Sequence, residues 1–132
     1  MGYTNYWNQF RDFTDEEWAQ IKNQIEYVGA VMDNVVIVYG VDFISFNGMG
    51  EEKHEDFLLS KKQMLSPNDV RMNRPYAFNF CKTAEKPYDL GVWYLLTWIY
   101  HNTDNAISIS RDRVGETSME EETYTGERRL LA

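Results

Sequence analysis

Residues 80–89, with the sequence FCKTAEKPYD, bring a thiol, a hydroxyl, two ammonium groups, a phenol and two carboxylates together. The run lies where a predicted strand passes into a predicted helix, and backbone N–H groups converge at the start of a helix. These residue types predict a site for a small anionic ligand. Lys82 and Lys86 would supply the charge, and Thr83 and Tyr88 would supply hydrogen bonds.

The same residues also have a purely structural interpretation. Asp89 could cap the helix, Pro87 could fix its entry, and the lysines could be solvated or paired with Glu85 and Asp89. An aspartate at the cap would compete with a ligand anion for the same backbone amides. The sequence leaves both interpretations open.

We expect residues 47–55 to form the other side of this site, facing residues 81–89. Asn47 begins a turn in this segment, and Glu55 is the one carboxylate besides Asp89 that we expect near the run. If the segment folds against residues 81–89, a pocket between the two would hold the ligand.

Catalytic and metal chemistry receive less support. The single cysteine, Cys81, could act as a nucleophile only if His54 lay beside it, since thiolate formation needs a basic partner. A lone cysteine on a strand usually packs in a core. A metal site would need His54, Glu55, Asp56 and His101, and no pair among them has zinc spacing. We predict no metal and no cofactor, and leave catalysis open.

Three segments resemble a family of small uncharacterised proteins from bacteria and their phages. They are the N-terminal segment GYTxYW at 2–7, the run FCKTAxKPYD at 80–89, and a middle segment at 47–57. The middle segment contributes Asn47, Gly48, Gly50, Glu55 and Phe57. The resemblance implies that these segments belong together and that the source is a phage or a bacterium. It implies no activity. Glu85 stands where the family pattern has a more basic residue, which weakens a phosphate-cradle interpretation.

Composition sets the other limits. With 132 residues, of which 43% are hydrophobic, the chain can form one domain with its own core. The net charge of −8 argues against direct nucleic-acid binding. It favours a second functional class, an acidic protein that binds and modulates a host protein. The carboxylates of that surface would be Glu16, Glu17, Glu26, Asp33 and Glu120 to Glu122.

The chain shows no secretory segment, and its longest apolar stretch, 90–100, is too short to span a bilayer. We therefore expect a cytoplasmic protein, in the host cytoplasm if a phage encodes it, with no membrane partner. Residues 1–113 are predicted to form a single domain. Residues 114–132 are predicted to be an acidic, flexible tail.

The elements that must position the site follow from periodicity. Thr14 and Glu17 form a capping box, which predicts a helix through about Met32. A second helix, apolar nearly all round, spans residues 90–100. Strands are predicted at 35–39 (central), 43–46, 56–60, 76–81 and 106–110. Residues 2–7 are predicted to be an irregular arm, and 61–74 a long basic loop with room for one helical turn. The result is an α+β domain, an antiparallel or mixed sheet of about five strands packed against two helices.

Overall fold

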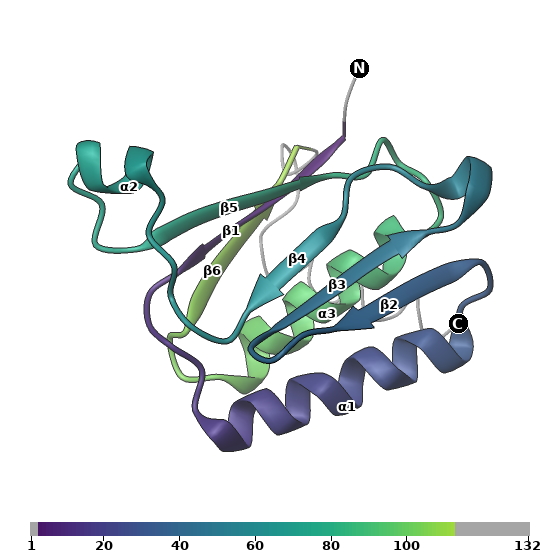
Figure 1. The fold of residues 1–132 in the computed structure, drawn as a ribbon, viewed down its shortest axis with the longest axis horizontal. Helices are drawn as coiled ribbons and strands as arrows, with labels where there is room; N and C mark the ends of the chain where they lie inside the picture. Colours follow the sequence, from purple (N-terminus) through teal and green to yellow (C-terminus); the bar gives the residue numbers. More distant parts are fainter. Residues whose placement is uncertain (1–2, 113–132) are drawn as a thin grey trace.

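The computed structural model describes residues 3–112 and shows an α+β fold (Figure 1). Its elements are β1 (Thr4–Gln9), α1 (Asp15–Val31), β2 (Val35–Tyr39), β3 (Phe43–Gly48), the 3-10 turn η1 (Gly50–Glu52), β4 (Phe57–Ser60), α2 (Pro67–Arg71), β5 (Ala77–Lys82), α3 (Asp89–Asn102) and β6 (Ile107–Arg111). The predicted tail at 114–132 lies outside the described residues.

The strands form two antiparallel sheets, in the orders β5-β1-β6 and β2-β3-β4. The predicted α+β class is confirmed, but the single sheet of about five strands is wrong. The two sheets approach each other at β4 and β5, where the Glu55 N–H donates to the Lys82 carbonyl over 3.3 Å. This hydrogen bond joins the two segments that the sequence predicts to flank the site.

The N-terminal segment is not an irregular arm but the central strand of its sheet. Tyr6 lies opposite Phe80 of β5 on one side and Ser110 of β6 on the other. Two of the three inward side chains of β1, Asn5 and Gln9, are polar. Because these inward residues are polar, β1 lacks the alternation of apolar and polar residues from which a strand is predicted.

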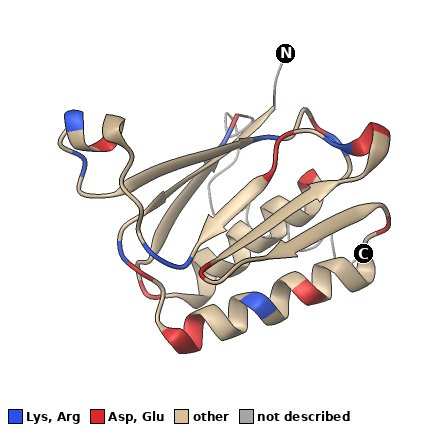
Figure 2. Cartoon of the chain, in the orientation of Figure 1, with Lys and Arg blue, Asp and Glu red and all other residues tan. Residues whose placement is uncertain are grey.

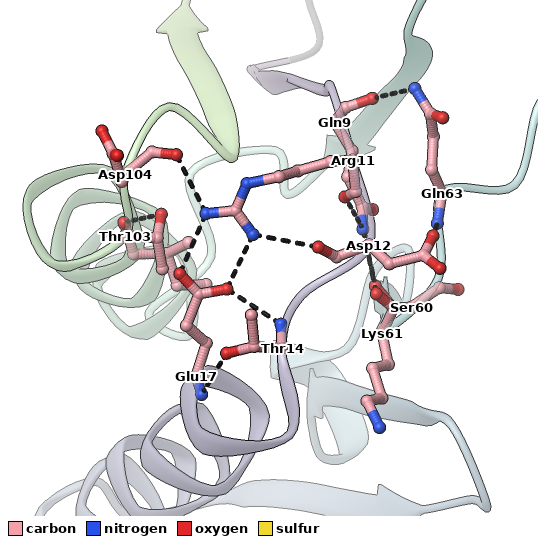
Figure 3. Close-up of polar contacts among 11 residues, drawn as sticks. Gln9, Arg11, Asp12, Thr14, Glu17, Ser60, Lys61, Gln63, Thr103 and Asp104 are labelled. Atoms are coloured by element: carbon pink, nitrogen blue, oxygen red, sulfur yellow. Dashed lines mark hydrogen bonds and ion pairs between the residues drawn. The ribbon is translucent and has the colours of Figure 1, made fainter.

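Helix α1 begins as predicted. The Thr14 hydroxyl accepts a hydrogen bond from the Glu17 N–H, and the Glu17 carboxylate accepts one from the Thr14 N–H, at 3.1 and 2.9 Å. Arg11 holds this carboxylate with two further hydrogen bonds and also donates to the Asp104 carbonyl (Figure 3). The Arg11 guanidinium lowers the pKa of Glu17. The helix start is therefore tied to the loop before β6.

Helix α3 is buried on nearly every side, as its sequence predicts. It packs against β1, β6 and α1, and its first turn also touches the second sheet. A Cβ atom on Gly91 would lie only 2.8 Å from the ring of Phe46, so glycine permits this close approach. No helix within residues 3–112 has the length and apolarity needed to cross a membrane.

Strand β2 differs from its prediction. Its apolar run at 35–39 predicts a central strand, but β2 is an edge strand. Val36 and Val38 are exposed on the outer face of their sheet, while Ile37 packs toward the core.

The predicted basic loop contains the short helix α2, which is organised around Asp69. The carboxylate of Asp69 is buried and accepts hydrogen bonds from the Ser66 and Phe78 N–H groups and from Arg74. The Ser66 N–H and the Arg74 guanidinium lower the pKa of Asp69 from its ordinary value of 3.8.

Asp69→Asn is expected to reduce the free energy of unfolding by about 1–3 kcal/mol at neutral pH, because hydrogen bonds to a charged group are lost. A carboxyl whose pKa is lowered in the folded state stabilises the fold above its unfolded pKa. This stabilisation disappears as the pH falls through the folded-state pKa. Urea unfolding at several pH values should show a difference between wild type and variant that is constant above about pH 5 and shrinks below about pH 4. A difference independent of pH would contradict this role.

Candidate functional site

The joint between β5 and α3 is a series of tight turns whose amides are mostly occupied. The Thr83 N–H donates to the Tyr3 carbonyl, the Lys86 N–H to Thr83, and the Asp89 N–H to Lys86, at 2.9 to 3.0 Å. The Leu90 N–H likewise donates to the Pro87 carbonyl. The expectation that free amides converge on a ligand at this helix start is therefore wrong for these four groups.

The backbone of the joint is strained. Ala84 and Glu85 follow one another with positive φ angles of 52° and 57°, a region that residues with a Cβ atom rarely occupy. Such conformations cost about 1–3 kcal/mol each and are concentrated at functional sites.

Asp89 is the centre of the polar network beneath the joint. It does not cap the helix as proposed from the sequence, because the N-cap is Tyr88, which makes no side-chain capping bond. Instead the Asp89 carboxylate accepts hydrogen bonds from Asn5 Nδ2 and Thr83 Oγ1, each at 2.7 Å. Its other oxygen pairs with the guanidinium of Arg111.

Arg111 is nearly enclosed, with 6% of its side chain exposed. Its guanidinium carbon lies over the rings of Tyr3 and Trp93, 4.6 Å from each ring centroid, and both contacts favour the cation. One edge binds Asp89. The Nε atom is buried without a hydrogen-bond partner among residues 3–112, and a buried donor left unpaired is costly.

A pocket of about 260 Å³ opens beside this arginine at the start of α3. We call it the α3 pocket. Its wall is formed by Tyr3, Glu85, Lys86, Pro87, Asp89, Leu90 and Arg111. Lys86 is the one predicted ligand-binding residue in this wall. Its ammonium makes no ion pair with a carboxylate in the described part of the chain.

The other predicted residues of the run have different positions. The ammonium of Lys82 lies 5.9 Å from the ring centroid of Phe80, on the outer face of the sheet. Thr83 is buried and supports Asp89. Tyr88 is also buried, and its hydroxyl donates to the Glu55 carbonyl over 2.6 Å.

Glu55 reaches the joint as predicted but serves as a structural tie. Its carboxylate accepts a hydrogen bond from the Lys82 N–H over 2.9 Å, and its backbone bonds to Lys82 and Tyr88. Segments 47–55 and 81–89 are therefore joined by direct hydrogen bonds, and neither of the two pockets described here is lined by both segments.

Asn47 belongs to a different surface. Its amide bonds to the His54 carbonyl and to Asp56, which closes the loop after β3. It also lines a second, shallow pocket of about 440 Å³ beside Val36, Val38 and other residues of the β2-β3-β4 sheet. Asn47 and Lys86 therefore line two separate pockets.

Cys81 cannot act as the nucleophile considered above. Its side chain is fully buried, and desolvation, with the nearby Glu55 charge, raises the pKa of the thiol to about 12. The thiol is therefore protonated at neutral pH. Within residues 3–112, no three His, Cys, Asp or Glu side chains are grouped so that they could hold a metal ion.

Cys81 in the native protein is expected to react with a disulfide reagent such as dithionitrobenzoate at least about 100-fold more slowly than the same thiol in the unfolded chain. At pH 8 the raised pKa leaves very little thiolate, and burial blocks access. The release of thionitrobenzoate would be followed with and without guanidinium chloride. A native rate close to the unfolded one would mean that the thiol is accessible.

Arg111 and Tyr3 are the functional candidates that the sequence prediction missed. The alternation of residues 106–110 did contain a signal for Arg111, because continuing it places this residue on the same side as Ile107 and Ile109. Comparisons of the chain with protein-family models, with curated proteins and with solved structures gave no significant match. The function must therefore be inferred from the geometry of the site.

Proposed function

We propose that this protein binds a small anionic ligand in the α3 pocket, with Arg111 and Lys86 as its charge partners. The observation that carries the proposal is a pocket lined by two cationic side chains, Arg111 and Lys86, of which Lys86 makes no ion pair with residues 3–112. An anion in this pocket would lie beside both cations, and charge-assisted hydrogen bonds to such groups are the strong ones. Asp89 does not compete for the ligand, because three side chains already occupy its carboxylate.

The pocket restricts the ligand in two ways. Its volume of about 260 Å³ lies below that of most drug-sized sites, which favours a ligand of a few heavy atoms. Glu85 in the wall disfavours multiply charged anions such as polyphosphates by repulsion. A small monocarboxylate or a singly charged phosphate ester fits both conditions.

Lys86→Ala is expected to lose at least about 10-fold in anion affinity, because a charged contact in a half-enclosed pocket is removed. The measurement is the rise in melting temperature with formate, acetate, lactate and inorganic phosphate. An anion at about 100 times its Kd stabilises the native state by about 2.7 kcal/mol. The fold should be intact in the variant, since Lys86 makes no ion pair within residues 3–112.

Lys82→Ala is the matched control. This lysine lies four residues away with the same charge, but its ammonium is over Phe80, outside the pocket. Wild type and Lys82→Ala should respond equally to the anion. The proposal fails if none of these anions raises the melting temperature, or if the two variants lose the response equally.

The alternative, an acidic protein that binds a host protein, is supported by the distribution of charge. Carboxylates gather on α1 and around η1 (Figure 2), and Glu16 and Glu26 are exposed on α1. Reversing these two charges should then abolish capture of a basic host protein. Capture that is unaffected by the reversal and by salt would count against this alternative.

A further inference from the structure

Strand β2 is an edge strand, and the direction of its backbone groups follows from its pairing with β3. In an antiparallel pair, residues whose N–H and carbonyl groups bond to the partner alternate with residues whose groups point away from it. The Met49 N–H donates to the Asn34 carbonyl at one end of the pair, and the Gly40 N–H donates to the Phe43 carbonyl at the other, over 2.9 and 2.8 Å. These two bonds fix the alternation, so the even-numbered residues of β2 bond to β3.

The odd-numbered residues of β2, Val35, Ile37 and Tyr39, consequently direct their N–H and carbonyl groups away from β3, to the open side of the sheet. Within residues 3–112 these backbone groups make no hydrogen bond to another element. Helix α1 runs along β2 (Figure 1) but meets it through the Ile37 side chain, since a Cβ atom on Gly29 would lie 2.7 Å from Ile37 Cδ1. A row of backbone groups of this kind is a template for a further strand.

The outer edge of β5, in the other sheet, is protected by side chains. There the Phe78 N–H donates to the Asp69 carboxylate over 3.4 Å, and the Lys82 N–H donates to the Glu55 carboxylate over 2.9 Å. Natural proteins also protect sheet edges with charged residues, prolines or bulges. Residues 35–39 contain no charge and no proline, and they pair with β3 without a bulge. The β2 edge therefore has none of these protections.

The β2 edge is complementary to a second copy of itself. Two β2 strands placed antiparallel about a two-fold axis at Ile37 would bring the two Ile37 residues opposite each other, and Val35 of each copy opposite Tyr39 of the other. All these pairs would be hydrogen-bonded, because the backbone groups of the three residues point outward. Val36 would lie opposite Val38 on the outer face, where these side chains are 42% and 51% exposed. Cross-strand contacts between branched side chains stabilise such pairs.

We propose that the β2 edge pairs with a second copy of this chain, so that two β2-β3-β4 sheets join into one continuous antiparallel sheet. A two-fold contact uses the same edge on both copies and leaves no β2 edge open, so assembly stops at the dimer. No like charges oppose each other along residues 35–39. Five paired residues on each side are fewer than the roughly 20–30 of a standard interface, and each copy has a net charge of −8. We therefore expect a weak dimer, with a Kd of about 10–100 μM.

The first test is sedimentation velocity of the full chain between about 5 μM and about 1 mM, in about 0.3 M salt to screen the net charge. We expect mainly monomer at the lowest concentration and mainly dimer at the highest. Amide hydrogen exchange at the same two concentrations reports the pairing. The Ile37 and Tyr39 N–H groups should exchange at least about 3-fold more slowly in the concentrated sample, whereas those of Val36 and Val38, bonded to β3, should be protected in both. A monomer at 1 mM, or a dimer in which the Ile37 N–H gains no protection, overturns the proposal.

The second test uses charges placed in the proposed register. Val36→Lys/Val38→Lys sets lysines directly opposite each other across the two-fold axis, so its Kd should rise at least about 10-fold, although its net negative charge is smaller. Mixing it with Val36→Glu/Val38→Glu should restore the dimer, because each lysine then faces a glutamate. Circular dichroism checks that the variants fold, and the exchange measurement on wild type does not depend on them.

Leu58→Lys is the matched control, because Leu58 of β4 is on the same outer face and has the same exposure as Val38, 51%. It should form the dimer as wild type does. Equal loss of the dimer in Leu58→Lys would mean that the copies stack face to face, which overturns the proposal. A mixture of the lysine and glutamate variants that stays monomeric overturns it as well.

Discussion

Asp89→Ala is expected to reduce the free energy of unfolding by about 3–5 kcal/mol, because it leaves a buried guanidinium without its counter-charge. The Arg111 side chain is 6% exposed and that of Asp89 is 12% exposed, so water replaces the lost partner only in part. Asn5 and Thr83 would lose their acceptor at the same time. Urea unfolding, followed by tryptophan fluorescence without added anions, measures the change.

A double variant separates the charge from the packing. Asp89→Leu with Arg111→Met removes both charges and keeps apolar volume, so it should be more stable than Asp89→Ala alone. A loss below about 1 kcal/mol in Asp89→Ala would show that the ion pair is solvated. In that case Arg111 would not be held rigidly for a ligand, and the proposed pocket would lose its anchor.

The elements that the sequence predicts well are those with local signals. The start of α1 follows from Thr14 and Glu17, three residues apart, and the burial of α3 follows from its apolar run. Strand β1 was missed because its identity depends on partners far along the chain. Asn5 lies opposite Cys81 on one side and Arg111 on the other. A polar residue that points inward can be assigned to a strand only when such partners are known.

The edge position of β2 was missed for a related reason. A short run of branched apolar residues occurs both in central strands and on edges, and sequence periodicity alone does not separate the two. Only the strand order shows that β2 has one neighbour. The outer valines are consequently exposed on a sheet face that the sequence assigns to the core.

The sequence predicts one segment of the candidate site but not the distant residues that complete it. The residue types at 82–89 direct attention to the start of α3, where Lys86 lines a pocket. The partners that complete the pocket, Tyr3 and Arg111, come from opposite ends of the described chain. The ion pair between Asp89 and Arg111 cannot be predicted from their spacing in the sequence, because it depends on how β6 packs against α3.

The packing of the second sheet against the joint can be tested at Phe46. Its side chain is fully buried, 6.0 Å from the ring of Tyr88 and against Gly91 in the first turn of α3. Phe46→Ala is expected to reduce the free energy of unfolding by about 3–5 kcal/mol, through lost burial and the cavity left behind. Urea denaturation followed by circular dichroism would measure it.

Phe43→Ala supplies the matched control on the same strand. Phe43 is 38% exposed, so removing its ring should cost about 1 kcal/mol or less. Phe46→Ala should also weaken anion binding in the α3 pocket more than Phe43→Ala, because it loosens the helix start that carries Lys86. Equal stability losses would contradict the assigned register, since a shift of one residue in β3 exchanges its inward and outward side chains. The unequal result would instead show that the second sheet holds the start of α3 in place.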